Sequence, residues 1–119
     1  MKKQIFVYDK DMCFNYLLKK SYSDHFEIES YTTRKKIIPN SKNNYAAAFF
    51  TINTLEDFHF FLNSSTFFKN LYVITSVRLF EFQISSMMSQ NIVIFDFNDD
   101  VKKNIIRELD FQLKLKKLL

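Results

Sequence analysis

Hydrophobic residues along this chain form short continuous runs, and amphipathic segments of helical spacing separate the runs. The most informative run covers residues 45–53 and reads Tyr-Ala-Ala-Ala-Phe-Phe-Thr-Ile-Asn. Because it is apolar on both faces, it is typical of a central strand in a parallel sheet covered by helices. Ligands of such sheets bind beyond the carboxyl ends of the strands. Thr51 therefore stands where a functional side chain is expected.

Four other apolar runs predict further strands, which cover residues 4–8, 26–32, 71–75 and 91–97. Residues 26–32 alternate between apolar and polar side chains, which predicts a strand at the edge of the sheet. The other three runs are rich in β-branched and aromatic residues, as expected for buried strands.

The segments between these runs predict helices. They are residues 12–21, a segment that Thr54 caps, residues 77–89, and a C-terminal segment that starts at Asp99 or Asp100. Asp11 is a favourable N-cap for the first of them. In the last, apolar residues recur every four positions, namely Val101, Ile105, Leu109 and Leu113. Residues 33–44 contain Pro39 and a polar tail, so we expect at most one helical turn there.

Strands and helices thus alternate along the whole chain. This alternation implies parallel strand pairing through right-handed crossovers. We therefore predict a single α/β domain over residues 1–119, with a doubly wound five-stranded parallel sheet and helices on both faces. The second helix of the series is expected to be short or missing.

Composition excludes several kinds of nucleotide site. The chain has no glycine and one proline. Phosphate-binding loops and dinucleotide-binding turns need glycines, because the backbone must turn tightly and approach the phosphate closely. We therefore expect neither a nucleotide cradle nor any other cofactor.

Charge and cysteine content favour an ordinary soluble protein. The formal net charge is +4, and the basic residues are dispersed along the sequence. A single cysteine, Cys13, excludes an intramolecular disulfide and fits a reducing compartment. No segment reads as a leader peptide or a membrane span. The expected location is cytoplasmic, without membrane contact.

The strand ends resemble those of the receiver domains of bacterial response regulators. In that family the first strand ends in an acidic pair that holds Mg²⁺, and the third ends in the aspartate that accepts a phosphoryl group. The fourth ends in Thr or Ser, and the fifth in Lys-Pro-Phe. The corresponding positions here are Asp9, Lys10 and Asp11, then Thr51, Thr75, and Phe95 or Asp96. The resemblance covers essentially the whole chain and implies the flavodoxin-like strand order 2-1-3-4-5.

These positions together form a degenerate phosphoacceptor pocket. An acyl phosphate requires a carboxylate, whereas Thr51 carries a hydroxyl. Lys10 replaces an acidic residue with a cation, which disfavours Mg²⁺, an ion that prefers carboxylate and other oxygen ligands. The lysine that neutralises phosphoryl charge is replaced by Phe95 or Asp96. We accordingly expect no phosphoryl transfer to aspartate, no catalytic residue and no metal site.

Lys10 has two readings. In one, its ammonium group pairs with Asp9 or Asp11 and replaces the missing metal charge. In the other, it points to solvent. The acidic residues Asp9, Asp11, Asp96, Asp99 and Asp100 are more simply explained as helix caps and strand ends than as a divalent-ion site. Whether they retain any such binding stays open.

Other reactive side chains have simple structural explanations. Cys13 follows a predicted N-cap without a second Cys or a His nearby, so we interpret it as a small buried core residue. His25 and His59 lie far apart and have no partner at a metal-type spacing. A catalytic set cannot be assembled from two such histidines.

The surplus of aromatic residues has two explanations, a larger core or a surface for a partner. The first group is Phe58, Phe60, Phe61, Phe67 and Phe68, and the second is Phe80, Phe82, Met87 and Met88. We single out the second group as the candidate partner surface, because receiver domains often pair through the corresponding face. The resemblance thus implies a protein partner, which includes a homodimer.

The sequence therefore predicts a non-catalytic pseudo-receiver that acts as a protein-binding adaptor or regulatory module in bacterial signalling. One alternative is a phosphoacceptor or small enzyme that uses an unconventional residue such as Thr51. Another is weak nucleic-acid binding through Lys114, Lys116 and Lys117. We regard this second alternative as unlikely, because no aromatic stacking platform accompanies these lysines.

Overall fold

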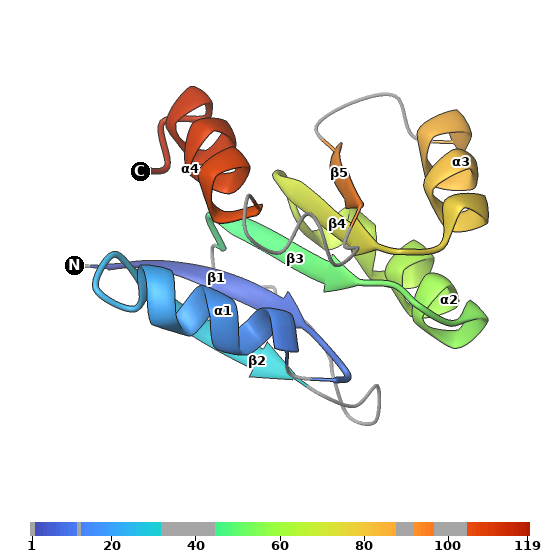
Figure 1. Cartoon of the computed structure of the whole chain (residues 1–119), viewed down its shortest axis with the longest axis horizontal. Coiled ribbons are helices and arrows are strands. Elements are labelled where there is room, and N and C mark those ends of the chain that lie inside the picture. Colours follow the sequence, from blue (N-terminus) through green and yellow to red (C-terminus); the bar gives the residue numbers. More distant parts are fainter. Residues whose placement is uncertain (1, 12, 32–44, 88–91, 97–104) are drawn as a thin grey trace.

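A five-stranded parallel sheet forms the centre of the molecule (Figure 1). The computed structural model describes residues 2–11, 13–31, 45–87, 92–96 and 105–119. The strands are β1 (Lys3–Tyr8), β2 (Phe26–Tyr31), β3 (Ala47–Thr51), β4 (Leu71–Thr75) and β5 (Ile92–Asp96). Their order is β2-β1-β3-β4-β5, and every neighbouring pair is parallel. This confirms the doubly wound sheet and the predicted order, with β2 at one edge.

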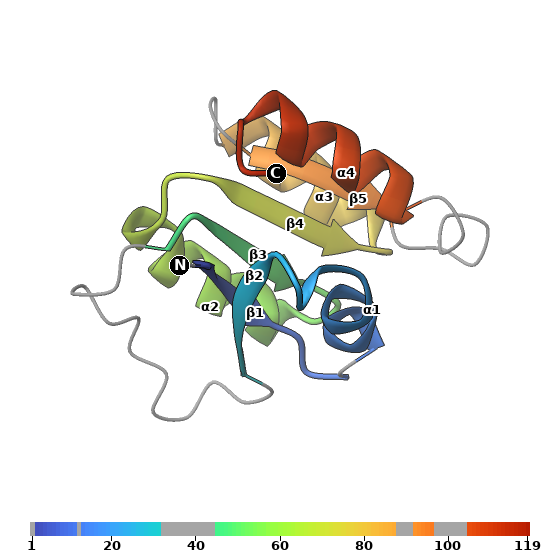
Figure 2. The same cartoon turned by 90° about the vertical axis from the view of Figure 1, so that its left-hand side faces the viewer.

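Helices cover both faces of the sheet, as predicted. They are α1 (Cys13–Tyr22), α2 (Leu55–Ser64), α3 (Arg78–Met87) and α4 (Ile105–Leu115), with a 3₁₀ turn, η1, at Ser65–Phe67. Helices α1 and α4 lie on one face, and α2 and α3 on the other (Figures 1 and 2). The expectations for residues 33–44 and for the start of the last helix at Asp99 or Asp100 fall outside the described residues. No helix in the described part of the chain is both long and apolar enough to cross a bilayer.

Strand β3 is buried along its whole length, as expected for the central strand. Its side chains alternate between two cores. Phe49 packs beneath α1 and α4 with Phe14, Leu18 and Leu109. Phe50 packs beneath α2 and α3 in a core rich in aromatic rings, where its ring contacts Phe6, Tyr8, Phe60, Phe61 and Phe68. Burial of this much apolar surface is the main force that holds both helical layers on the sheet.

The surplus aromatic residues belong largely to this second core. Phe58 and Phe61 are buried, and Phe60 contacts Tyr8 at a ring distance of 4.7 Å. Phe80 was expected on a partner surface, and that expectation is wrong. It is buried and stacks on Phe58 at 5.3 Å, because α3 turns this side chain toward α2. The larger-core explanation therefore holds for Phe80 and for the aromatic residues of α2.

Two helix ends have well-defined caps. Thr54 caps α2 as predicted, within a capping box in which the Thr54 hydroxyl accepts from the Asp57 N–H and the Asp57 carboxylate accepts from the Thr54 N–H. Helix α4 ends in a Schellman motif, since the Leu118 N–H donates to the Leu113 carbonyl and the Lys117 N–H to the Lys114 carbonyl. Lys117 takes the left-handed position of this motif, with φ of 58°, where glycine is usual.

Candidate functional site

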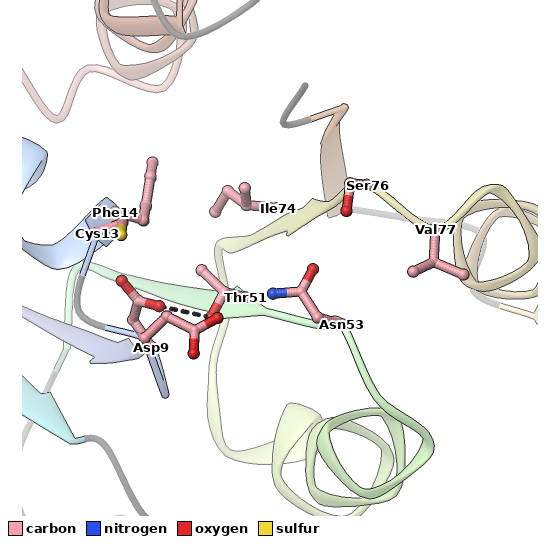
Figure 3. Close-up of a pocket in the computed structure, with 9 residues that line it drawn as sticks. Asp9, Cys13, Phe14, Thr51, Asn53, Ile74, Ser76 and Val77 are labelled. Atoms are coloured by element: carbon pink, nitrogen blue, oxygen red, sulfur yellow. Dashed lines mark hydrogen bonds between the residues drawn. The ribbon is translucent and has the colours of Figure 1, made fainter. Parts of the chain in front are cut away.

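A pocket of about 350 Å³ opens at the carboxyl ends of the central strands (Figure 3). Its walls come from the ends of β1, β3 and β4 and from the first turn of α1. The lining residues are Asp9, Asp11, Cys13, Phe14, Thr51, Asn53, Ile74, Ser76 and Val77. This is the place where ligands of doubly wound sheets bind. The sequence prediction of the site's position agrees with the geometry.

Asp9 is the central acidic group of the pocket. It follows β1 directly, and only 3% of its surface is exposed. Its backbone N–H donates to the Tyr31 carbonyl at 2.9 Å, which continues the pairing of β1 with β2. The carboxylate accepts from the Asn15 N–H in the first turn of α1 at 2.8 Å. Such a bond satisfies one of the free N–H groups of the helix start and places negative charge at the positive end of the helix dipole.

Thr51 faces Asp9 across the floor of the pocket (Figure 3). Its Oγ1 lies 3.1 Å from Asp9 Oδ1 and 3.2 Å from the Tyr8 carbonyl oxygen. A hydroxyl has a single proton, so Thr51 donates to one of these acceptors at a time. Asp9 Oδ2 therefore has the Asn15 N–H as its own donor, and Oδ1 has the Thr51 hydroxyl when that hydroxyl does not donate to the Tyr8 carbonyl. Asp9 and Thr51, both predicted site residues, are thus brought together.

The residues next to Asp9 are more exposed. Asp11 lines the pocket and is exposed. The structure does not test its expected role as an N-cap, because Met12 lies outside the described residues. The Lys10 side chain is also exposed and is not among the lining residues, which agrees with the hypothesis that it points to solvent. The donors that satisfy Asp9 are a hydroxyl and an amide, not an ammonium group.

Cys13 was expected in the core, and that expectation is wrong. Its thiol is free and exposed, and it lines the pocket. The physical reason is its place as the first residue of α1, at the mouth of the pocket, whereas the next residue, Phe14, turns inward and is buried.

Thr75 lies at the end of β4 but does not line the pocket. Its hydroxyl accepts from the Val77 N–H at 3.1 Å and so stabilises the turn into α3. The backbone of Thr75 pairs with that of Asp96 on β5. The side chains of Phe95 and Asp96 lie outside the described part of the structure. The structure therefore does not test the prediction that Phe95 or Asp96 replaces the receiver lysine.

Of the predicted partner surface, Phe82 is exposed to 71%. Leu79, one turn earlier on α3, is exposed to 61%. The Met87 side chain and all of Met88 fall outside the described residues. Phe82 is therefore the member of the predicted surface that is exposed in the described residues, and Leu79 is an exposed apolar neighbour that the prediction did not include.

Sequence reasoning missed two polar residues of the pocket, Asn53 and Ser76. Ser76 directly follows the predicted strand 71–75, and Asn53 is the last residue of the predicted run 45–53, so the rule that strand ends carry the site gave a usable signal. It also missed a second buried aspartate, Asp57, on the opposite face of the sheet. The Thr54-x-x-Asp57 spacing, typical of a capping box, signalled this residue.

Asp57 fixes the loop that leads from β3 into α2. The Tyr8 hydroxyl donates to Asp57 Oδ1 at 2.8 Å. The other oxygen, Oδ2, accepts from the N–H groups of Asn53 and Thr54, both at 3.2 Å. Asn53 lines the pocket, and its backbone N–H is bound to the same carboxylate that Tyr8 contacts. The Tyr8–Asp57 hydrogen bond therefore helps to position this part of the pocket wall. It also ties the end of β1 to α2 across the aromatic core.

The donor set of the pocket fits Mg²⁺ poorly. Mg²⁺ requires nearly octahedral oxygen coordination and is usually held by carboxylates. Asp9 and Asp11 are the acidic residues of the lining; Asp9 Oδ2 accepts from the Asn15 N–H, and Oδ1 lies within hydrogen-bond distance of the Thr51 hydroxyl. Across the described ranges there is no group of three His, Cys, Asp or Glu side chains that could hold a metal ion.

Comparisons with known proteins add one structural likeness. No protein family matches the sequence, and neither does any curated protein. Among solved structures, the chain is similar to the response regulator protein TrrA from Thermotoga maritima, determined in complex with Mg(2+)-BeF. The alignment covers 100% of both chains, with 20% sequence identity and a TM-score of 0.49. The strand order β2-β1-β3-β4-β5 by itself shows the flavodoxin-like arrangement, which receiver domains share with other proteins.

Proposed function

We propose that this chain is a receiver-like signalling domain that accepts no phosphoryl group on aspartate and acts by binding another protein. The observation that carries the proposal is the position of Thr51. It ends the central strand, lines the pocket and is hydrogen-bonded to Asp9. The receiver resemblance requires a carboxylate at this position.

The chemistry of the pocket supports the first half of the proposal. A hydroxyl cannot form an acyl phosphate, and the Thr51 hydroxyl is 5% exposed and held between two acceptors. Phosphoryl transfer depends on cations that neutralise the developing negative charge. Lys10, at the position of the second acidic residue, is exposed and does not line the pocket. The described lining contributes no cationic side chain.

Exposed apolar side chains support the second half. Leu79 and Phe82 project from α3 at the spacing of one helical turn, and both are more than half exposed. Apolar residues that share one helix face and lack contacts within the fold are characteristic of protein-binding surfaces. A binding role needs neither a metal ion nor a reactive carboxylate in the pocket.

Intact-mass measurement tests the phosphoryl half directly. The wild-type chain is incubated with acetyl phosphate and Mg²⁺, and its mass is expected to stay unchanged. The matched control is the double variant Lys10→Asp/Thr51→Asp, which restores a carboxylate at both positions of the receiver resemblance. A stoichiometric gain of one phosphoryl group by the wild type would defeat the proposal. If the phosphate proved acid-stable and disappeared in Thr51→Val, Thr51 would be identified as the acceptor.

A further inference from the structure

Lysines gather at the end of the molecule opposite the pocket. In a parallel sheet with helical crossovers, strand starts and helix ends lie at the same end. Here that end carries exposed lysines from β1, α1, α4 and the turn before β4, which we call the lysine end: Lys2, Lys3, Lys19, Lys20, Lys69, Lys114, Lys116 and Lys117. The sequence divides these lysines into four separate groups, which is why the basic residues appear dispersed along the chain.

Hydrogen bonds show that these segments meet in space. Lys3 Nζ donates to the Lys117 carbonyl at 3.3 Å, which joins the start of β1 to the turn after α4. Lys2 Nζ donates to the Ser23 carbonyl at 2.9 Å, which joins it to the end of α1. The Tyr22 hydroxyl donates to the Asp110 carboxylate and ties α1 to α4. Both chain ends accordingly lie on the same side of the molecule (Figures 1 and 2).

Helix stability explains only part of this cluster. Lys19, Lys20 and Lys114 occupy last turns, where cations complement the helix dipole. The remaining lysines precede strands or follow a helix and have no such role. Exposed carboxylates are fewer than lysines at this end, namely Asp24 and Glu27. The opposite end carries the exposed acidic residues Asp11 and Glu56 together with the exposed Lys10. Lysine therefore predominates at the lysine end, although charges of both signs occur at each end.

Lys117 takes part in this end through its backbone. Its φ of 58° puts it in the left-handed region, where glycine is free of steric cost and a lysine is not. The Schellman motif points this lysine's segment back onto β1, where its carbonyl accepts from Lys3.

Exposed leucines lie among the lysines. Leu115 is 60% exposed and Leu119 is 39% exposed, and they alternate with Lys114, Lys116 and Lys117. We propose that the lysine end docks an acidic surface of the protein partner, with Leu115 and Leu119 contacting apolar residues within it. This inference rests on the proposed function and names the chemistry of the partner.

A nucleic acid fits this surface less well. Base stacking needs exposed aromatic rings, and phosphate recognition favours the planar fork of arginine. In the described ranges the exposed Tyr and Phe rings are Tyr16, Phe82 and Phe111, and none lies in the last turn of its helix. The exposed ring at the lysine end is the imidazole of His25. The described arginines, Arg78 and Arg107, lie at the starts of α3 and α4, toward the pocket end. A phosphate backbone would also leave Leu115 without an apolar contact.

Fluorescence anisotropy with defined probes tests the proposal. The first probe is a labelled peptide that repeats Glu-Leu-Glu-Glu. Its controls are polyglutamate of equal length, the same peptide with glutamine for glutamate, oligothymidylate, and vesicles containing phosphatidylserine. The expected order of affinity places the Glu-Leu peptide first, and its binding should weaken with added salt, since the contacts are exposed ion pairs. Leu115→Asn should remove its advantage over polyglutamate.

Three lysine variants separate charge from stability. Lys114→Gln/Lys116→Gln/Lys117→Gln should weaken peptide binding about tenfold, as expected for three rim charges. Lys10→Gln, which removes one exposed lysine at the pocket end, should leave it unchanged. Lys117→Gly is the most informative variant, because it should raise the urea midpoint while it weakens binding. A raised midpoint with unchanged binding would show that the Lys117 side chain takes no part in docking.

Other outcomes also decide the question. Binding of oligothymidylate or of phosphatidylserine vesicles at least as tight as that of the Glu-Leu peptide would overturn the choice of an acidic protein surface. So would equal loss of binding in Lys10→Gln and the triple variant. These results leave the intact-mass experiment untouched, so a failed docking proposal and a failed pseudo-receiver proposal are distinguishable.

Discussion

Two buried aspartates lie on opposite faces of the sheet, and the molecule uses them differently. Asp9 is 3% exposed and Asp57 is 2% exposed. Each carboxylate accepts hydrogen bonds from backbone N–H groups at the start of a helix, and each lies within hydrogen-bond distance of one side-chain hydroxyl. Asp9 receives the Thr51 hydroxyl, and Asp57 receives that of Tyr8. Only Asp9 lines the pocket, whereas Asp57 is enclosed between α2 and the aromatic core.

This difference shows that burial alone does not identify a functional carboxylate. The donors of Asp57 are the N–H groups of Asn53 and Thr54, just before α2, and the Tyr8 hydroxyl of β1. The donors of Asp9 come from α1 and from the end of the central strand, and they meet at an opening. A carboxylate at an opening keeps water and ligands within reach, whereas an enclosed one has only the protein's own donors.

The largest effect is expected from removal of the enclosed carboxylate. Asp57→Ala should lower the free energy of unfolding by about 3 kcal/mol, because it removes a cap and leaves the Tyr8 hydroxyl buried without its acceptor. Urea unfolding measures the change. Asp57→Asn keeps one carbonyl acceptor and should lose less. Equal stability of Asp57→Ala and wild type would show that the capping box contributes nothing.

Removal of the pocket carboxylate should cost less. Asp9→Ala is expected to lower the free energy of unfolding by about 1–2 kcal/mol, since water in the pocket can replace the lost acceptor for Asn15 N–H and Thr51. The comparison with Asp57→Ala in the same buffer is the measurement. A larger loss at Asp9 than at Asp57 would reverse the assignment of the two aspartates.

The hydroxyl at the end of β3 should contribute still less. Thr51→Val keeps the shape of the side chain and should cost about 1 kcal/mol, the value of one ordinary hydrogen bond. A double-mutant cycle with Asp9→Ala isolates the coupling of the pair. Additive losses would show that the 3.1 Å contact carries no interaction energy.

A third carboxylate, at the sheet edge, should show the smallest effect and a distinct pH dependence. Glu29 accepts from Tyr31 at 2.6 Å and from Tyr45 at 2.5 Å. The hydrogen bond to Glu29, together with partial burial, raises the pKa of Tyr31 from 10.0 to about 12. A pKa that rises on folding adds stability below the unfolded pKa, and this stability is lost as pH rises through the folded pKa.

Stability should therefore fall between about pH 10 and pH 12, and Glu29→Gln should flatten this fall. Near neutral pH the variant should change the free energy of unfolding by less than about 1 kcal/mol, because Glu29 is partly exposed to solvent. Urea unfolding of both proteins across this range is the measurement. Parallel curves for the two proteins would contradict the role of Glu29.

Sequence patterns predicted most of the fold because local periodicity and burial agree here. The apolar run at β3 forms a strand that is buried on both faces. Ile105, Leu109 and Leu113, which recur every four residues, form the buried face of α4. The strand-end rule placed Asp9 and Thr51 together, since parallel strands finish at one edge.

The errors and omissions concern side-chain direction, which a sequence does not encode locally. Cys13 and Phe14 are neighbours, yet the first faces the pocket and the second the core. Phe80 resembled Phe82 in sequence but packs against Phe58. The Tyr8–Asp57 bond joins residues 49 positions apart and depends on how α2 lies over β1. The lysine end likewise appears only when β1, α1 and α4 are brought together.

Tyr8 and Asp9 are adjacent residues, and their side chains leave β1 on opposite faces to make the two polar contacts compared above. A slip of this strand by one residue would exchange the faces of the two side chains, which would move the Tyr8 phenol away from Asp57 and turn the Asp9 carboxylate toward the aromatic core. The two contacts together therefore fix the register of β1. Insertion or deletion of a single residue in this strand should prevent folding, whereas loops far from it should tolerate such changes.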